Sequence, residues 1–245
     1  MFRKNKKEEV GKIVVAGEYE RPDKGGYDRL RDNALFLNAD GNTNVLQIES
    51  SVAHEGKTTV ACNLAVSLGQ TGKKTIVAEL DFHRPTAHRV FRAESEGIAG
   101  YILGTATKEK VIKHTEFENV DVLPRGGEID NPSLVLISEK FKNLIAELKK
   151  EYDYVILDCA PVLQSSDFIH ISKVADGTIL LVAYAETTRY QVEETVTELK
   201  KSGVRLLGTV FTKYDPKKGY DYYYGAEYGA KSGTKNGVRY GEKDK

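Results

Sequence analysis

A run of residues suited to holding a phosphate chain occupies positions 51–59, Ser-Val-Ala-His-Glu-Gly-Lys-Thr-Thr. Gly56 would let backbone N–H groups turn toward a triphosphate, Lys57 would reach its β and γ phosphates, and Thr58 would offer a hydroxyl to Mg²⁺. A Gly-Lys-Thr triplet also occurs in ordinary turns. Here an apolar run precedes the triplet and an apolar helical pattern follows it, so a helix N-terminus would add its dipole. This placement favours a phosphate-binding loop over an ordinary turn.

Acidic residues follow two other apolar runs. Glu79 and Asp81 come at the end of the run 75–78, and Asp158 ends the run 154–157. Residues two apart on a strand project to the same side, and open α/β sheets bind ligands at the carboxyl ends of their strands. Carboxylates there can hold Mg²⁺ through water and accept a proton from an attacking hydroxyl. The alternative for the first pair is an acidic strand end with a salt bridge to Arg84, and a lone aspartate after a strand is common.

Tyrosines are concentrated near the C-terminus. The chain has 14 tyrosines, and those after position 213 are Tyr214, Tyr220, Tyr222, Tyr223, Tyr224, Tyr228 and Tyr240. Val238 is almost the only aliphatic partner there, so the segment cannot bury enough apolar surface to offset its ordering entropy and is predicted to be a disordered tail. Either RNA stacking or phosphate acceptance could use such tyrosines. Because Arg239 is the sole arginine nearby and the chain is not basic, phosphate acceptance is favoured.

Strand-like and helix-like segments alternate between these sites. Apolar runs predict strands at 45–48, 75–78, 120–123, 154–157, 178–183 and 206–211, and helical patterns lie at 27–36, 60–68, 134–152, 166–174 and 187–202. This alternation predicts an α/β fold, a mainly parallel sheet of the P-loop NTPase type with helices on both faces. The expected organisation is a flexible segment at 1–24, a P-loop domain at 25–213 and a tyrosine-rich tail at 214–245.

Composition narrows the function classes. Lys+Arg and Asp+Glu number 36 each, which argues against a general nucleic-acid binder. No apolar run is long enough to span a membrane, and no secretory signal is recognisable. Cys62 and Cys159 are far apart and are expected to be small buried hydrophobes in a reducing compartment. We therefore expect a cytoplasmic protein.

Further motifs give the chain a family resemblance. They are Glu55-Gly-Lys-Thr-Thr followed by Asn63-Leu-Ala, Asp81-Phe-His-Arg-Pro85, Gly97-Ile, Leu103-Gly104, Leu123-Pro-Arg-Gly126, Asn131-Pro132 and the strand ending at Asp158. With the tyrosine cluster, they make the chain resemble the bacterial tyrosine autokinases that control capsule and exopolysaccharide production. The resemblance extends from about Tyr27 to the C-terminus.

The resemblance implies a site and two ligands, ATP and Mg²⁺. The implied nucleotide contacts are Glu55, Gly56, Lys57, Thr58 and Thr59, and the implied metal ligands are Thr58, Asp81 and Asp158. The implied catalytic residues are Lys57, Glu79, Asp81 and Asp158, with either Glu79 or Asp81 as the base for tyrosine. The implied phosphate acceptors are Tyr220, Tyr222, Tyr223, Tyr224 and Tyr228.

The resemblance also implies partners. Kinases of this type in firmicutes work with a separate transmembrane activator that influences polymer length, a polysaccharide co-polymerase, which recruits them to the inner face of the membrane. A cognate tyrosine phosphatase and a homo-oligomer are further implied partners, with no nucleic acid among them. The family's Glu-x-x-Arg-x-x-Arg motif for ring assembly is replaced by Gly25, Asp28 and Arg31, so the oligomeric state is left open.

Other departures keep two alternatives open. His54 and Ala53 stand where the family has glycine and proline, and Glu79 replaces an aspartate. These changes motivate a nucleotide-sensing scaffold with reduced transfer. Partitioning and septum-positioning ATPases share the fold, but they carry a lysine near the start of the loop where this chain has Val52, and they would give the tyrosine tail no role.

Overall fold

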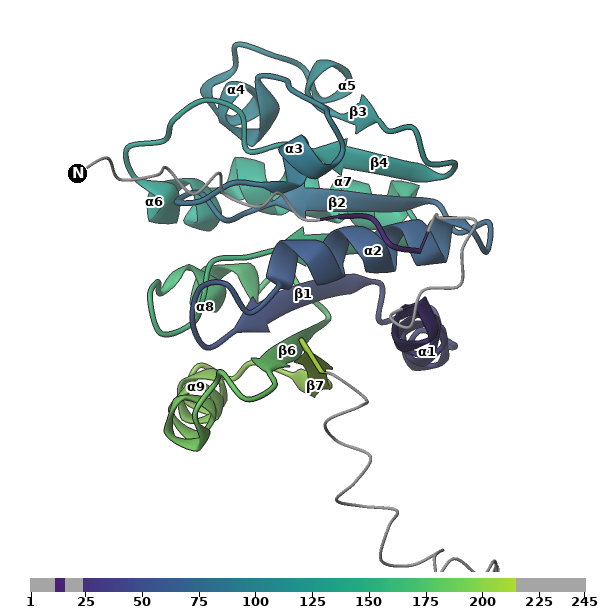
Figure 1. The fold of residues 1–245 in the computed structure, drawn as a ribbon. Coiled ribbons are helices and arrows are strands. Elements are labelled where there is room, and N and C mark those ends of the chain that lie inside the picture. The colour runs from purple at the N-terminus through teal and green to yellow at the C-terminus, as the bar shows by residue number, and fades with distance from the viewer. Residues whose placement is uncertain (1–11, 16–23, 215–245) are drawn as a thin grey trace, which may run out of the picture. The chain divides into compact units, whose positions relative to one another are not determined.

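The computed structural model describes residues 12–15 and 24–214, and the described residues up to Thr212 form one compact unit. This unit is built on a seven-stranded sheet in the order β3-β4-β2-β5-β1-β6-β7 (Figure 1). The strands are β1 Val45–Ser50, β2 Thr75–Glu79, β3 Lys113–His114, β4 Val120–Leu123, β5 Tyr154–Asp158, β6 Gly177–Ala183 and β7 Leu206–Thr212. All neighbouring pairs run parallel except β3 with β4. The predicted fold class is confirmed.

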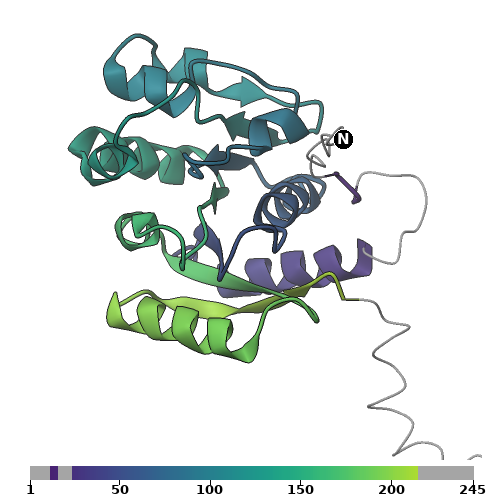
Figure 2. The ribbon, with the colours of Figure 1, turned by 60° about the vertical axis from the view of Figure 1, so that its left-hand side comes forward.

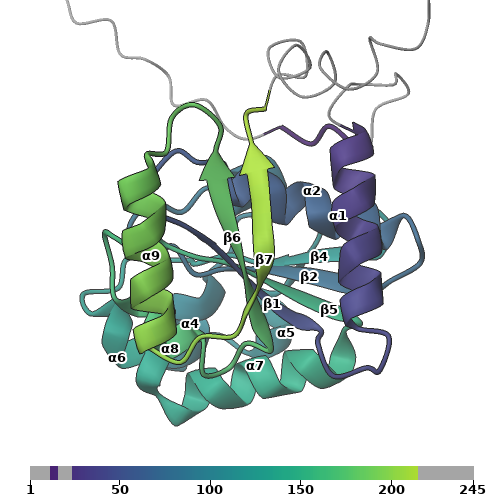
Figure 3. The same cartoon turned by 90° about the horizontal axis from the view of Figure 1, so that it is seen from below.

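Helices cover both faces of the sheet (Figure 2). They are α1 Lys24–Leu37, α2 Lys57–Gly69, α3 Ala87–Val90, α4 Gly97–Leu103, α5 Lys108–Val111, α6 Pro132–Ile137, α7 Glu139–Glu151, α8 Asp167–Ile171 and α9 Arg189–Lys201. Residues from α1, α2 and α3 share one apolar cluster with the sheet, whereas α7 and α9 contribute to clusters on the other face. Seen from below, α1 and α9 flank the pair β6 and β7 (Figure 3).

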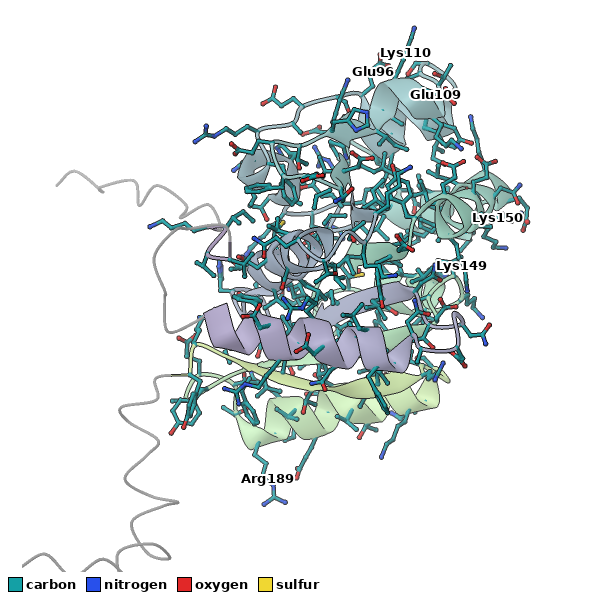
Figure 4. All side chains as sticks on the ribbon, turned by 90° about the vertical axis from the view of Figure 1, so that its right-hand side faces the viewer. Glu96, Glu109, Lys110, Lys149, Lys150 and Arg189 are labelled. Atoms are coloured by element: carbon teal, nitrogen blue, oxygen red, sulfur yellow. The ribbon has the colours of Figure 1, made fainter. Side chains whose placement is uncertain are left out.

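Strand β5 shows why the central strands are continuously apolar. Tyr154 and Ile156 belong to the cluster beneath α2, while Val155 and Leu157 belong to the cluster beneath α7. Because successive side chains point to opposite faces, a strand covered on both faces needs apolar residues at every position. The outer surface carries solvent-exposed ion pairs instead, such as Arg189 with Glu193 on α9, where Arg189 points away from the sheet (Figure 4).

The helix predicted at 134–152 is wrong in one respect, because it is two helices. Ser138 between α6 and α7 is extended, and its hydroxyl oxygen accepts a hydrogen bond from the Phe141 N–H at 3.1 Å. That bond caps α7, which forces the chain out of helical geometry at Ser138. The sequence patterns also missed α3, α4, α5 and the two-residue β3.

Residues 12–15 lie against α2. Asn63 Oδ1 accepts a hydrogen bond from the Val14 N–H at 2.7 Å, and the Asn63 amide donates to the Lys12 carbonyl at 2.8 Å. The Val15 side chain is buried. The boundaries 1–24, 25–213 and 214–245 stay predictions, and the acceptor tyrosines predicted between 220 and 228 lie outside the described residues.

In the part of the chain that the structure describes, none of the helices combines the length and apolar character needed to cross a bilayer.

Candidate active site

The predicted phosphate loop connects β1 to the first turn of α2. Gly56 precedes the helix with φ 95°, and a Cβ built on it would lie 3.8 Å from Cγ2 of Thr212. A Cβ would therefore fit in the available space. Glycine is favoured at this position because of the left-handed backbone conformation. His54 also has a positive φ, 67°, a conformation that histidine tolerates better than most residues. Histidine in place of the family's glycine at position 54 is thus compatible with the backbone conformation of this loop.

The Lys57 side chain folds back toward the end of β1. It is largely buried, and Nζ donates a hydrogen bond to the Ser50 hydroxyl at 2.9 Å. The Ser50 hydroxyl in turn donates to the Val52 carbonyl at 2.8 Å. The positive charge is therefore tethered by a neutral group beside the N-terminus of α2. Such a cation, together with free helix N–H groups, favours an anion at this place.

Thr58 and Asp158 meet at the edge of the same loop. The Thr58 hydroxyl donates to Asp158 Oδ2 at 2.7 Å, and the Thr86 hydroxyl donates to Thr58 at 3.0 Å. Asp158 is buried, its Oδ1 has no partner among the described residues, and burial raises the pKa of its carboxyl to about 7. An orphaned buried carboxylate oxygen beside a threonine hydroxyl offers the oxygen ligands that Mg²⁺ and its bound water prefer. The residues present therefore fit a magnesium ion.

Asp81 and Glu79, predicted to face the same crevice, have different surroundings. Asp81 Oδ1 accepts the backbone N–H groups of His83 and Arg84 at 3.1 and 2.9 Å, rather than the salt bridge to the Arg84 guanidinium that was the alternative. Glu79 is fully buried. Its Oε1 lies 2.9 Å from His88 Nδ1, and its Oε2 accepts the Arg125 N–H at 2.8 Å. Both Glu79 oxygens are thus engaged inside the protein.

Glu55 shapes the loop from within. Its buried carboxylate accepts the Val52 N–H at 2.8 Å and contacts the Thr187 hydroxyl, while its carbonyl accepts the Thr212 hydroxyl at 2.7 Å. Ser50, Thr86, Thr187 and Thr212 were not predicted from the sequence. Ser50 and Thr212 end strands, whereas Thr86 and Thr187 lie in the connections that lead to helices. Serine and threonine are too common at such places to stand out.

Glu49, in β1 two residues before the loop, is fully buried. Its Oε1 accepts a hydrogen bond from the Gln47 amide at 2.8 Å, while Oε2 has no partner among the described residues. Burial raises the pKa of this carboxyl to about 8. Folding therefore takes up a proton at neutral pH.

This uptake predicts a pH-dependent stability. Because the folded pKa is raised, the contribution of Glu49 is complete below about pH 4.5, its unfolded value, and is lost as pH rises through about 8. The loss is about 1 kcal/mol per pH unit in that window. We expect Glu49→Gln to flatten the stability curve between pH 5 and 8, measured by urea unfolding. The exposed Glu194→Gln is the control; an equal slope in wild type and Glu49→Gln would contradict the prediction.

The family described as the AAA domain matches residues 47–205. Tyrosine-protein kinase YwqD of Bacillus subtilis is 31% identical over 229 residues, covering 92% of this chain and 97% of that protein. The chain belongs to the bacterial protein-tyrosine kinase family. The family resemblance predicted from the motifs is confirmed.

Solved structures agree with this kinase family. The chimerical protein CapA2B2 has a TM-score of 0.78 and 29% identity, over 84% of this chain and 93% of that chain. The septum site-determining protein MinD from Pyrococcus horikoshii, solved with Mg-ADP, has a TM-score of 0.60 and 28% identity, over 70% and 71%. This chain thus shares its fold with CapA2B2 and with MinD, and MinD carries Mg-ADP.

Proposed function

We propose that this bacterial protein-tyrosine kinase transfers the γ-phosphoryl group of ATP to tyrosines of its own C-terminal tail. The acceptors would be Tyr220, Tyr222, Tyr223, Tyr224 and Tyr228. The observation that carries the proposal is the loop in which Lys57 and the Thr58–Asp158 pair face the same edge of the sheet. Family membership supplies the reaction class, and the tyrosine-rich tail supplies acceptors within the same chain.

In the proposed mechanism the loop residues bind the phosphates, and Asp81 serves both the metal and the acceptor tyrosine. The N–H groups of residues 55–59 would hold the phosphates. The Lys57 ammonium group would contact the γ-phosphoryl group that is transferred. Thr58, Asp158 and Asp81 would hold Mg²⁺, which when bound neutralises charge on the phosphates. Catalysis then comes mainly from positioning and charge neutralisation, with little covalent chemistry required of the protein.

The geometry favours Asp81 over Glu79 as the base for tyrosine. Both oxygens of Glu79 are engaged, by His88 and by the Arg125 N–H. Asp81 uses Oδ1 for two backbone N–H groups, and its Oδ2 takes part in none of the hydrogen bonds found among the described residues. A base must reach the proton that it accepts. We therefore assign proton acceptance to Asp81 and a supporting role to Glu79.

The cellular role follows from the family. We propose that tail phosphorylation regulates exopolysaccharide or capsular polysaccharide production, with a transmembrane activator that recruits the kinase to the inner face of the membrane and a tyrosine phosphatase that reverses the reaction. Added negative charge on the tail would weaken contacts between copies. A partitioning-type ATPase gains less support, since the tyrosine tail has no place in that function.

Labelled ATP tests this proposal. Full-length protein is incubated with labelled ATP, Mg²⁺ and the cytoplasmic tail of the activator, and labelled residues are mapped. We expect label on the tail, lost when the five acceptor tyrosines become phenylalanine. Tyr190→Phe is the matched control, because Tyr190 is an exposed tyrosine of α9 outside the tail. An unlabelled tail in the wild type would reject autokinase activity.

A further inference from the structure

The segment Leu123-Pro-Arg-Gly126 has no task in the mechanism above, yet its backbone is tightly fixed. The N–H groups of Ile98 and Ala99, in the first turn of α4, donate to the carbonyls of Pro124 and Arg125 at 2.9 Å each. Gly126 has φ 83°, and a Cβ on it would lie 1.8 Å from the Glu96 carbonyl oxygen. The loop after β4 is therefore interlocked with the start of α4, and Arg125 leaves it from a rigid base.

Arg125 reaches both sides of Asp81. Its backbone N–H donates to Glu79 Oε2 at 2.8 Å, two residues before Asp81. Its guanidinium Nη1 donates to the Phe82 carbonyl at 3.0 Å, one residue after Asp81. On the other side of Glu79, His88 from α3 contacts the same carboxylate. Through these contacts Glu79 and Arg125 fix the backbone on both sides of Asp81.

The contact to Phe82 bears directly on Asp81. The Phe82 carbonyl and the His83 N–H belong to the same planar peptide unit. Arg125 holds the carbonyl end of that unit, and the N–H end donates to Asp81 Oδ1 at 3.1 Å. A cation on the carbonyl polarises the peptide and strengthens the hydrogen bond that its N–H makes. The Arg125 guanidinium therefore strengthens one of the two backbone hydrogen bonds that orient the Asp81 carboxylate, the other being donated by the Arg84 N–H.

We infer that Arg125 is a positioning residue, which fixes Asp81 through the peptide between Phe82 and His83 so that Oδ2 stays directed at the acceptor hydroxyl. The inference rests on the proposed function, since it assumes that Asp81 receives the tyrosine proton. It assigns Arg125 no contact with ATP or tyrosine. A less firmly held Asp81 would meet the acceptor in a smaller fraction of encounters, which lowers kcat and leaves the phosphate loop that holds ATP unchanged.

The test is a double-mutant cycle on full-length protein. Arg125→Met keeps most of the side-chain length without its donors, Arg125→Lys keeps a cation, and Arg189→Met on α9 is an exposed control. We expect Arg125→Met to lower kcat for tyrosine phosphorylation about 10- to 100-fold, with KM for ATP unchanged within about twofold. Arg125→Lys should recover part of the loss, and Arg189→Met should match wild type.

The cycle with Asp81→Asn separates positioning from general structural damage. If Arg125 acts through Asp81, Arg125→Met should cost little more once Asp81 is already asparagine. An equal loss in both backgrounds, or an Arg125→Met variant as active as wild type, would overturn the inference. Thermal unfolding and fluorescent-nucleotide binding of every variant show whether it folds; should Arg125→Met not fold, Arg125→Lys replaces it in the cycle. A wild type that binds ATP but forms no phosphotyrosine would defeat the proposed function instead, independently of these differences.

Discussion

Replacing Lys57 with methionine is expected to lower the rate of phosphotyrosine formation by at least about 100-fold. The change removes the cation that the Ser50 hydroxyl holds over the phosphate loop, while the methionine stem fills the same buried space. Loss of one preorganised charge at the transferred phosphoryl group has an effect of this size because the group's charge must be stabilised in the transition state. The measurement is the initial rate of label incorporation at saturating MgATP.

A second lysine serves as the control for this prediction. Lys201, on α9, pairs with Glu198 and is largely exposed, so Lys201→Met should keep the wild-type rate. Thermal unfolding should be similar for both variants. A Lys57→Met protein that transfers phosphate within about tenfold of wild type would contradict a phosphate-binding role for Lys57.

Asp81→Asn is expected to lower kcat, whereas Glu79→Gln is expected to lower the free energy of unfolding. Asparagine keeps an Oδ1 that can accept the His83 and Arg84 N–H groups, so Asp81→Asn should fold normally. It cannot take a proton at neutral pH, and kcat should fall about 10²- to 10⁴-fold. Binding of ATP without Mg²⁺ should change little, because the phosphate loop is intact.

Glu79→Gln should act mainly on stability. The glutamine NH₂ would face either the Arg125 N–H or the His88 N–H. Each of these groups donates a hydrogen bond to Glu79 in the wild type, so a donor would then face a donor. Loss of a hydrogen bond to a buried charged group costs about 1.5–3 kcal/mol, which urea unfolding would detect. The assignment of the base to Asp81 would be wrong if Glu79→Gln abolished transfer at unchanged stability while Asp81→Asn stayed active.

Much of the fold could be predicted because burial on two faces leaves a clear pattern. Runs such as 154–157 and 178–183 have to be apolar throughout, and their strands appear as β5 and β6. The break at Ser138 could not be predicted from periodicity, since Ile137, Phe141 and Leu144 keep helical spacing across it. It depends on a single side-chain cap. The helices α3 and α5 have four residues each, too few to show a period.

The site also has a part that the sequence predicts and a part that it does not. Gly56, Lys57 and Thr58 are adjacent in the chain, so their spacing alone indicated the loop. The surroundings of Glu79 depend on Arg125, which is 46 residues away, and the Thr212 contact to Glu55 spans 157 residues. No local pattern encodes such contacts, because they arise only when the sheet places β4 beside β2 and β7 two strands from β1. For that reason the sequence left two candidates for the base.

Intact-mass spectrometry of the full-length protein, produced with its activator, tests the central claim most directly. The account predicts a series of masses separated by single phosphate groups, which tyrosine phosphatase collapses to the unmodified mass. Lys57→Met should show only the unmodified mass. An unmodified wild type, or the same series in Lys57→Met, would contradict ATP-dependent autophosphorylation at this loop.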